Sequence, residues 1–120
     1  MGKEHNYTLT VKWTGNRGDG TINAAAYDRN HTISVKNKVD IAGSSDTPFR
    51  GDGTRHNPED MFVSSLSTCH MLWYLHLCAD AGVIVTDYVD NPKGIMVEVA
   101  IGGGHFKEVV LHPVVKVKDA

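Results

Sequence analysis

The chain contains two cysteines, and Cys69 is the one whose surroundings suit chemistry. Small side chains precede it at Ser64, Ser65, Ser67 and Thr68, which leaves room beside the sulfur. A thiol reacts with oxidants and electrophiles as the thiolate, which nearby positive charge must stabilise. The alternative is a packed, inert thiol, because free cysteine is among the most buried residue types. Reactivity at Cys69 therefore depends on a cation supplied by another part of the chain.

Two arginines, Arg50 and Arg55, are the natural source of that cation. They lie just before the segment that carries Cys69, in a stretch rich in glycine and polar residues. Arginine keeps its charge even when it is partly buried. These two guanidinium groups are therefore the candidates to stabilise a thiolate.

The second cysteine, Cys78, is expected to be a core residue. It lies nine positions after Cys69, so in a helix it points about half a turn away and lies about 13 Å further along the axis. A disulfide requires Cα atoms within about 7 Å of each other. The two sulfurs therefore cannot bond within one straight helix.

The seven histidines do not have the spacing of metal ligands. His70 and His76 are six residues apart and the others are scattered, with no HxxxH or CxxC pattern. His70 follows Cys69 directly, but neighbouring side chains of a helix diverge by 100° and do not face one another. We expect no metal and no bound cofactor, and hydrolysis by a Cys–His pair finds no histidine base here.

Length, composition and charge limit the classes of protein to which this chain can belong. A length of 120 residues with 41% hydrophobic and 22% charged residues predicts one soluble globular domain, residues 1–120. A net charge of -2 gives no basic field to attract nucleic acid. The sequence has no apolar run long enough to span a membrane and no signal-peptide core at its start, so we expect a cytoplasmic protein with no membrane partner.

One long helix is expected to position Cys69. Asn57 is a typical N-cap, Pro58 suits the first helical position, and acidic residues follow in the first turn. No further proline or glycine occurs before Gly82, which predicts a helix over residues 58–81. Its second half is apolar nearly all round, so we expect a central helix that is enclosed on most sides.

Strands are expected on both sides of this helix. Alternating polarity predicts a strand at residues 7–13. After the glycine-rich run at residues 15–20, two more short strands are predicted at residues 21–28 and 31–36, joined to the first as an antiparallel meander, and then a long loop over residues 42–56. Further strands are predicted at residues 83–89, 94–101 and 106–118. The glycine-rich runs at residues 15–20 and 102–104 precede no helix, so they predict hairpin turns rather than phosphate loops. The fold class is α+β.

Four motifs together resemble the OsmC/Ohr family of organic hydroperoxide reductases, and its OsmC-like branch in particular. The likeness extends from about Tyr7 to about Val115. The motifs are Gly43-Ser44-Ser45-Asp46, Phe49-Arg50-Gly51-Asp52, Asn57-Pro58-Glu59-Asp60, and Cys69 ten residues after the glutamate. The resemblance implies a tightly intertwined homodimer, with antiparallel sheets around long central helices and active sites between the subunits.

The resemblance also implies a role for each matching residue. Cys69 would be the peroxidatic thiol that reduces organic hydroperoxides to alcohols through a sulfenic acid. Arg50 would be the arginine that stabilises its thiolate, and Glu59 would be the acid that holds this arginine in place. In the Ohr branch the arginine comes from the first turn, where Arg17 stands. The expected reductant is an external, lipoyl-type dithiol. Apolar walls that favour organic substrates are expected from Phe62, Leu66 and Trp73.

Helix geometry adds a prediction about symmetry. Glu59 and Cys69 are about 15 Å apart along one helix, so we expect Glu59 to serve the thiol of a second subunit, with two helices crossing near Ser64 and Ser65.

One departure from the family pattern remains. Family members that form an intramolecular disulfide carry a second cysteine in a C-terminal helix, which residues 1–120 do not include. Either the sequence is incomplete there, or an external thiol resolves Cys69. A non-catalytic dimeric scaffold or small-ligand binding protein is the alternative function.

Overall fold

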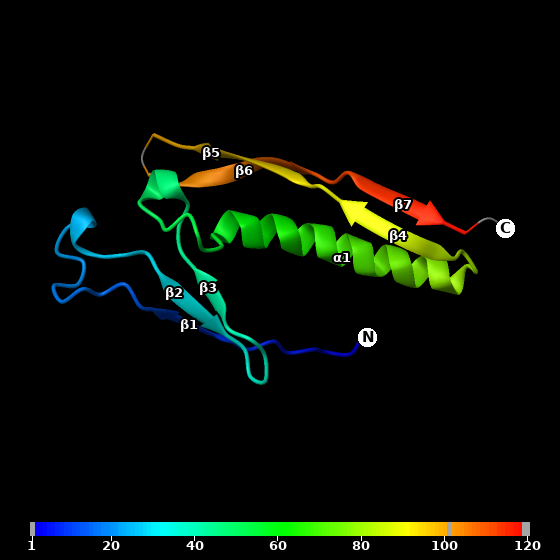
Figure 1. The fold of residues 1–120 in the computed structure, drawn as a ribbon, viewed down its shortest axis with the longest axis horizontal. Coiled ribbons are helices and arrows are strands. Elements are labelled where there is room, and N and C mark those ends of the chain that lie inside the picture. The colour runs from blue at the N-terminus through cyan, green and yellow to red at the C-terminus, as the bar shows by residue number, and fades with distance from the viewer. Residues whose placement is uncertain (1, 101, 119–120) are drawn as a thin grey trace. The chain divides into compact units, whose positions relative to one another are not determined.

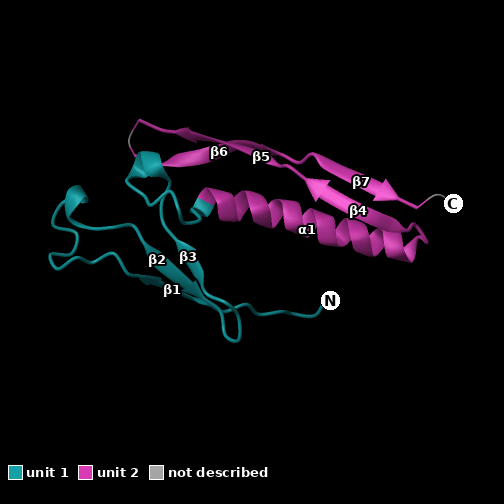
Figure 2. Cartoon of the chain, viewed as in Figure 1, with its two compact units in different colours: residues 1–58 teal, residues 59–120 magenta. Residues whose placement is uncertain are grey.

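The computed structural model describes residues 2–100 and 102–118, which divide into two compact units (Figure 2). The first unit comprises residues 1–58 and the second residues 59–120. Each unit is described by itself.

The first unit contains a three-stranded antiparallel sheet in the order β1-β2-β3 (Figure 1). Val11 lies opposite Ile33, and Thr32 lies opposite Ala42. The sheet is an antiparallel meander as predicted, but only two of its three strands are those that the sequence indicated. Its strands are β1 (Thr10–Trp13), β2 (His31–Ser34) and β3 (Ile41–Gly43).

The third strand of this sheet is not the one that the sequence predicted. Residues 21–28 contain the short 3-10 helix η1 (Ala24–Ala26) instead of a strand. The Asn23 side chain accepts a hydrogen bond from the amide of Ala25, which caps this turn and competes with an extended backbone. The predicted strand at 21–28 is wrong, and β3 lies partly within the predicted loop.

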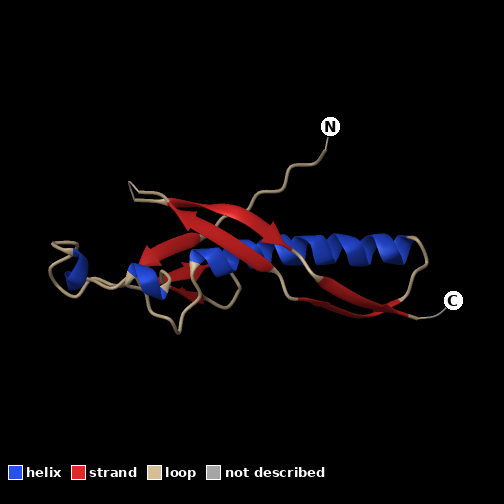
Figure 3. Ribbon diagram, turned by 90° about the horizontal axis from the view of Figure 1, so that it is seen from above, coloured by secondary structure: helices blue, strands red, loops and turns tan. Residues whose placement is uncertain are grey.

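The second unit begins with the predicted long helix, α1 (Pro58–Asp80), which Figure 3 shows in blue. Acidic residues occupy its first turn, where the helix dipole favours negative charge. At the other end, Gly82 has φ +76 and the amide of Val83 bonds to the carbonyl of Cys78. The left-handed glycine therefore ends the helix close to the predicted position.

Four strands follow α1 and form two antiparallel pairs, β4 with β7 and β5 with β6. The prediction of one strand over residues 106–118 is wrong, because residues 111–112 interrupt it. β4 and β5 follow one another in the sequence but do not pair with each other. The glycines at 102–104 lie at the predicted hairpin turn. The strands are β4 (Val85–Asp90), β5 (Lys93–Glu98), β6 (Gly104–Val110) and β7 (Pro113–Val117).

Asp90 ties the middle of α1 to the junction between the two strand pairs. One carboxylate oxygen accepts a hydrogen bond from the Ser67 hydroxyl at 2.5 Å, and the other accepts one from the backbone amide of His112 at 2.6 Å. Hydrogen bonds to a charged group are among the stronger ones in proteins. This carboxylate fixes how α1 lies on the strands.

We expect Asp90→Ala to lower the free energy of unfolding by about 2 to 3 kcal/mol, because both charge-assisted hydrogen bonds are lost. Urea unfolding at one fixed protein concentration measures the effect. Asp87→Ala is the matched control, since Asp87 is an exposed carboxylate on the same strand, and it should cost less than about 0.5 kcal/mol. Equal effects of the two substitutions would contradict the role of Asp90.

In the single chain, no described hydrophobic side chain is buried. The second half of α1 was expected to be enclosed, yet Leu72, Trp73 and Leu77 are 61%, 63% and 60% exposed. The prediction of an enclosed helix is therefore wrong for the single chain. Among the described helices, none is long and apolar enough to cross a membrane.

Candidate functional site

Cys69 is exposed and lies on a face of α1 whose apolar side chains remain largely exposed in the single chain. The side chains of this face recur at alternating steps of three and four residues, the spacing of a helix that pairs with another helix. We call this face the Cys69 seam. Its members are Glu59, Phe62, Leu66, Cys69, Trp73, His76 and Asp80.

The hydroxyl groups beside the seam point back onto their own helix. Ser64 donates to the carbonyl of Met61 at 3.0 Å, and Ser65 donates to that of Phe62 at 2.7 Å. Thr68 likewise donates to the carbonyl of Ser64 at 2.8 Å. With their donors satisfied, these small side chains present little polarity, and a second backbone can approach closely.

His70 lies on another side of α1 and faces the strands. Its Nδ1 lies 3.2 Å from the hydroxyl of Tyr88 on β4, and its ring stacks on Tyr74. Burial raises the pKa of Tyr88, and the charge of Asp90 acts in the same direction. The ring of His70 is therefore held by the strands, which does not favour a role as the base for Cys69.

Glu59 is half-buried in the first turn of α1, ten residues before Cys69. Within the described part of the chain, its carboxylate makes no hydrogen bond or ion pair. The helix dipole stabilises the negative charge of a carboxylate in the first turn, and the Glu59 oxygens are available to bind a cation.

Arg50 is exposed and has an unusual backbone conformation, with φ +62 and ψ +27. It ends the short helix η2 (Thr47–Phe49), and its amide bonds to the carbonyl of Thr47. A non-glycine residue in the left-handed region is uncommon and requires support from its surroundings.

The loop around Arg50 supplies that support. The amide of Gly51 bonds to the carbonyl of Asp46, and the Ser45 hydroxyl donates to the carbonyl of Phe49. A Cβ at Gly51 would lie 1.5 Å from the carbonyl oxygen of Ser45, so only glycine fits there. The backbone of Arg50 is thus fixed, while its guanidinium makes no ion pair with the residues described.

Arg55, the second candidate, is engaged within the same loop. Its Nε lies 3.7 Å from Asp52, and its guanidinium donates to the carbonyl of His31. Hydrogen bonds from Thr54 lower the pKa of the Asp52 carboxyl, and Arg55 contributes to the shift. The amide of Asp52 in turn donates to the hydroxyl of fully buried Ser44. Arg55 therefore has a structural role.

Arg17 is also paired within its own turn. Its guanidinium donates to the carbonyl of Ala25, and its Nε lies 3.7 Å from a carboxylate oxygen of Asp28. Of the three arginines considered, Arg50 is thus the one whose charge is not already paired. Arg17 and Arg50 lie in the first unit, whereas Glu59 and Cys69 lie in the second.

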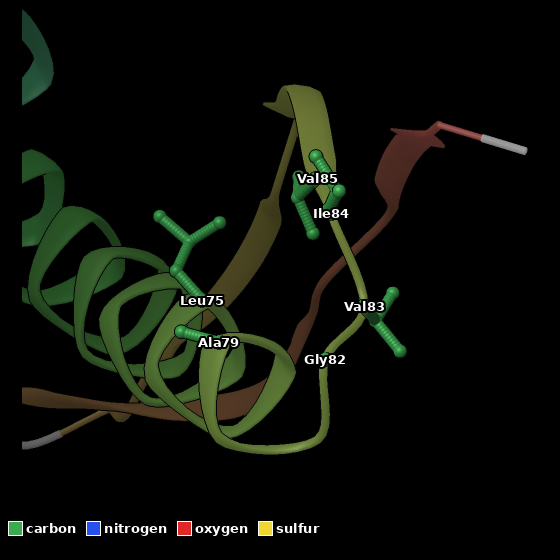
Figure 4. A pocket seen from close by; sticks show the side chains of 6 residues that line it. All are labelled: Leu75, Ala79, Gly82, Val83, Ile84 and Val85. Atoms are coloured by element: carbon green, nitrogen blue, oxygen red, sulfur yellow. The ribbon is translucent and has the colours of Figure 1, made fainter. Parts of the chain in front are cut away.

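Pockets lie beside α1 at the Cys69 seam and at the turn into β4. One borders the Cys69 seam, is lined by Leu72, Trp73 and His76, and has a volume of about 270 Å³. The other lies where α1 turns into β4 and has a volume of about 570 Å³. Figure 4 shows its lining, in which no side chain is titratable; the residues are Leu75, Ala79, Gly82, Val83, Ile84 and Val85. The pocket beside the seam is the one whose lining includes a titratable side chain, His76.

Sequence reasoning missed Phe106 as a member of the apolar wall. Its ring lies 4.7 Å from that of Phe62, measured between centroids, and it contacts the position of Gly94 on the paired strand. Phe106 is 44 residues from Phe62, so no local pattern connects them. Among the residues described, no group of three His, Cys, Asp or Glu side chains could hold a metal ion.

Comparisons with known proteins agree with this architecture. The family model described as "OsmC-like protein" matches residues 51–120, which include Glu59 and Cys69 but not Arg17 or Arg50. "Uncharacterized protein YmaD" of Bacillus subtilis (strain 168) is 28% identical over 116 residues, which are 96% of this chain and 69% of that protein.

A solved structure shares the fold as well. It is the OsmC-like protein of unknown function VCA0330 from Vibrio cholerae O1 biovar eltor str. N16961. The TM-score is 0.83 at 27% sequence identity, over 98% of this chain and 78% of the other. The predicted α+β class, with one long helix and antiparallel sheets, is confirmed.

Proposed function

Because this chain belongs to the OsmC-like protein family, we propose that it is a thiol-dependent peroxidase that reduces organic hydroperoxides at Cys69. The observation that carries the proposal is the exposed thiol on an apolar helix face, together with two groups of opposite charge, Glu59 and Arg50, that form no ion pair with the described residues. An uncharged organic substrate favours apolar walls, and a thiolate needs a cation.

The reaction has one oxidation step. The Cys69 thiolate attacks the distal oxygen of ROOH, an S–O bond forms and the O–O bond breaks. The sulfur becomes sulfenic acid, and the other oxygen takes up a proton and leaves as the alcohol ROH. Arg50 stabilises the thiolate and the developing charge on the leaving oxygen, and Glu59 orients the guanidinium through a charge-assisted pair.

An external dithiol completes the cycle. Its first thiol displaces water from the sulfenic acid to give a mixed disulfide, and its second thiol releases Cys69 and leaves as part of a disulfide. Cys78 is unsuited to this step, since it lies about 13 Å further along α1 and points to another side of the helix.

We further propose that two copies pair through the Cys69 seam. The heptad spacing, the inward hydroxyls of Ser64 and Ser65, and the exposed apolar side chains all favour a close helix–helix contact. An antiparallel pair centred on these serines brings Glu59 of each copy towards Cys69 of the other. The site is then built from both subunits.

Mass spectrometry of the reduced protein after brief exposure to cumene hydroperoxide tests the activity. We expect a sulfenic acid at Cys69, trapped by dimedone, and catalytic turnover when a dithiol is added. Cys69→Ser should remove both, whereas Cys78→Ser should keep both. Oxidation of Cys69 no faster than that of free cysteine would instead support a non-catalytic scaffold.

A further inference from the structure

We propose that Tyr88 and Asp90 of β4 are positioning residues for Cys69. Tyr88 holds His70 and Asp90 holds Ser67, so the strand grips α1 on both sides of the thiol in the sequence. Both residues act through the helix and not on the reacting atoms. This inference rests on the proposed peroxidase function and adds two residues to it.

The two contacts come from alternate residues of one strand. Tyr88 and Asp90 are two positions apart on β4, so their side chains project from the same face. One carboxylate oxygen of Asp90 accepts a hydrogen bond from the Ser67 hydroxyl at 2.5 Å. The Tyr88 hydroxyl lies 3.2 Å from Nδ1 of His70. The strand therefore contacts α1 just before and just after Cys69.

Both anchoring side chains are themselves held in place. The other carboxylate oxygen of Asp90 accepts a hydrogen bond from the His112 amide at 2.6 Å. The ring centroid of Tyr88 lies 5.7 Å from that of Tyr74, and the His70 ring stacks on Tyr74 with centroids 6.3 Å apart. Neither anchor can turn away from α1 without breaking a second contact.

Helix geometry converts these contacts into a position for the sulfur. Successive residues turn by 100°, so Ser67 and His70 are about 60° apart around the axis, and Cys69 points about 130° away from their midpoint. The strand thus directs the thiol onto the Cys69 seam. The sulfur lies about 5 Å from the axis, so a rotation of about 12° moves it by about 1 Å. A misplacement of this size can lower a rate constant about 100-fold.

The contacts towards the two ends of α1 are less suited to fix its rotation. Near the start, the ring of Phe62 packs on that of Phe106, and hydrophobic attraction has no preferred direction. Near the end, Leu75 and Ala79 line a pocket of about 570 Å³ together with residues 82–85 (Figure 4), and side chains beside a void lack packing partners there. The hydrogen bonds from β4, in contrast, require a defined angle as well as a distance.

Single-turnover oxidation of Cys69 by cumene hydroperoxide tests the assignment. Tyr88→Phe and Ser67→Ala each remove one of the two hydrogen bonds and little else. Each should lower the rate constant about 5-fold, because the other bond still restrains the helix. The double variant should lower it about 100-fold, which exceeds the product of the two single effects, because α1 is then free to rotate.

Alkylation of Cys69 by iodoacetamide distinguishes positioning from a general loss of structure. Alkylation requires an exposed thiolate, but it does not require a hydroperoxide to be aligned with Arg50 and Glu59. Its rate constant should therefore stay within about twofold of the wild-type value in all three variants, with the same pH profile. A parallel loss of alkylation and oxidation would overturn the inference, because it indicates a change in thiol ionisation or in folding.

Tyr74→Phe is the matched control. Tyr74 belongs to the same aromatic cluster, but its hydroxyl makes no hydrogen bond with the residues described. Its loss should leave the oxidation rate constant within about twofold of the wild-type value. His70→Asn should be oxidised faster than His70→Ala, because the Asn amide can bond to the Tyr88 hydroxyl near the position of Nδ1.

Two results separate this inference from the proposed function. A wild-type Cys69 that is oxidised no faster than free cysteine would remove the peroxidase proposal and the positioning role with it. A wild-type protein that reacts rapidly, together with a double variant that reacts equally rapidly, would keep the peroxidase and overturn the positioning role.

Discussion

Arg50→Ala is expected to slow the oxidation of Cys69 by cumene hydroperoxide about 100-fold at neutral pH, the usual cost of losing one donor to a developing negative charge. Of the three candidate arginines, Arg50 is the one whose guanidinium makes no ion pair with the residues described, and its backbone is fixed by its loop. Stopped-flow tryptophan fluorescence or quenched mass spectrometry measures the rate constant. Arg50→Lys should recover part of the loss, because it keeps the charge without the planar fork.

The comparison with Arg17→Ala makes this prediction specific. Arg17 is paired with Asp28 and the carbonyl of Ala25, so its removal should mainly loosen its own turn. A larger loss of rate from Arg17→Ala than from Arg50→Ala would contradict the assignment and give the role to Arg17. Thermal unfolding of both variants shows whether a loss of rate reflects a loss of structure.

Mixing two inactive variants is expected to restore activity if the site is shared between subunits. Glu59→Gln keeps Cys69, and Cys69→Ser keeps Glu59, so a mixed dimer has one site with both native groups. Random exchange of subunits makes about half of the dimers mixed, which predicts about a quarter of wild-type activity. Each variant alone should have at most about 1% of it, since the orienting carboxylate or the thiol is absent.

The measurement is steady-state turnover after co-refolding of the two variants at equal concentration. The control is the double variant, Glu59→Gln with Cys69→Ser in one chain, mixed with wild type. Its mixed dimers contain no site with both native groups, so its activity should come from the wild-type dimers alone. No recovery in the first mixture, with subunit exchange confirmed by mass, would place each complete site within one subunit.

Local rules of the sequence were sufficient to predict α1 and the position of Cys69 on it. Asn57, Pro58 and Gly82 mark the ends of the helix through backbone geometry, and the spacing of Glu59 and Cys69 then follows from helix periodicity. These features depend on neighbouring residues alone. The prediction of their positions therefore did not require the tertiary structure.

The errors arose where distant residues decide the backbone. The segment 21–28 follows a glycine-rich run, as the second strand of a meander would, but the side chains of Trp13, Arg17 and Arg29 hydrogen-bond to its carbonyls and fold it into a compact turn. The segment 106–118 is interrupted where Asp90 captures the amide of His112, next to Pro113, which has no amide proton to donate. Neither set of contacts is visible in a local pattern.

The three candidate arginines differ in their ion-pair partners, and their positions in the sequence do not distinguish them. Arg17, Arg50 and Arg55 all lie in polar loops, and spacing alone left them as alternatives. The structure distinguishes them because Asp28 and Asp52 neutralise two of the three charges. Phe106 was missed for a related reason, since only the pairing of β5 with β6 brings it to Phe62.

The absence of buried hydrophobic side chains among the described residues of the single chain has a thermodynamic consequence. Apolar burial is the main favourable term in folding, so under the proposed pairing through the Cys69 seam this chain would gain much of that burial on association. Folding and assembly would then form one equilibrium that obeys mass action, and each tenfold dilution would cost about 1.4 kcal/mol of apparent stability per dimer. The proposed pairing therefore predicts a melting temperature that rises with protein concentration.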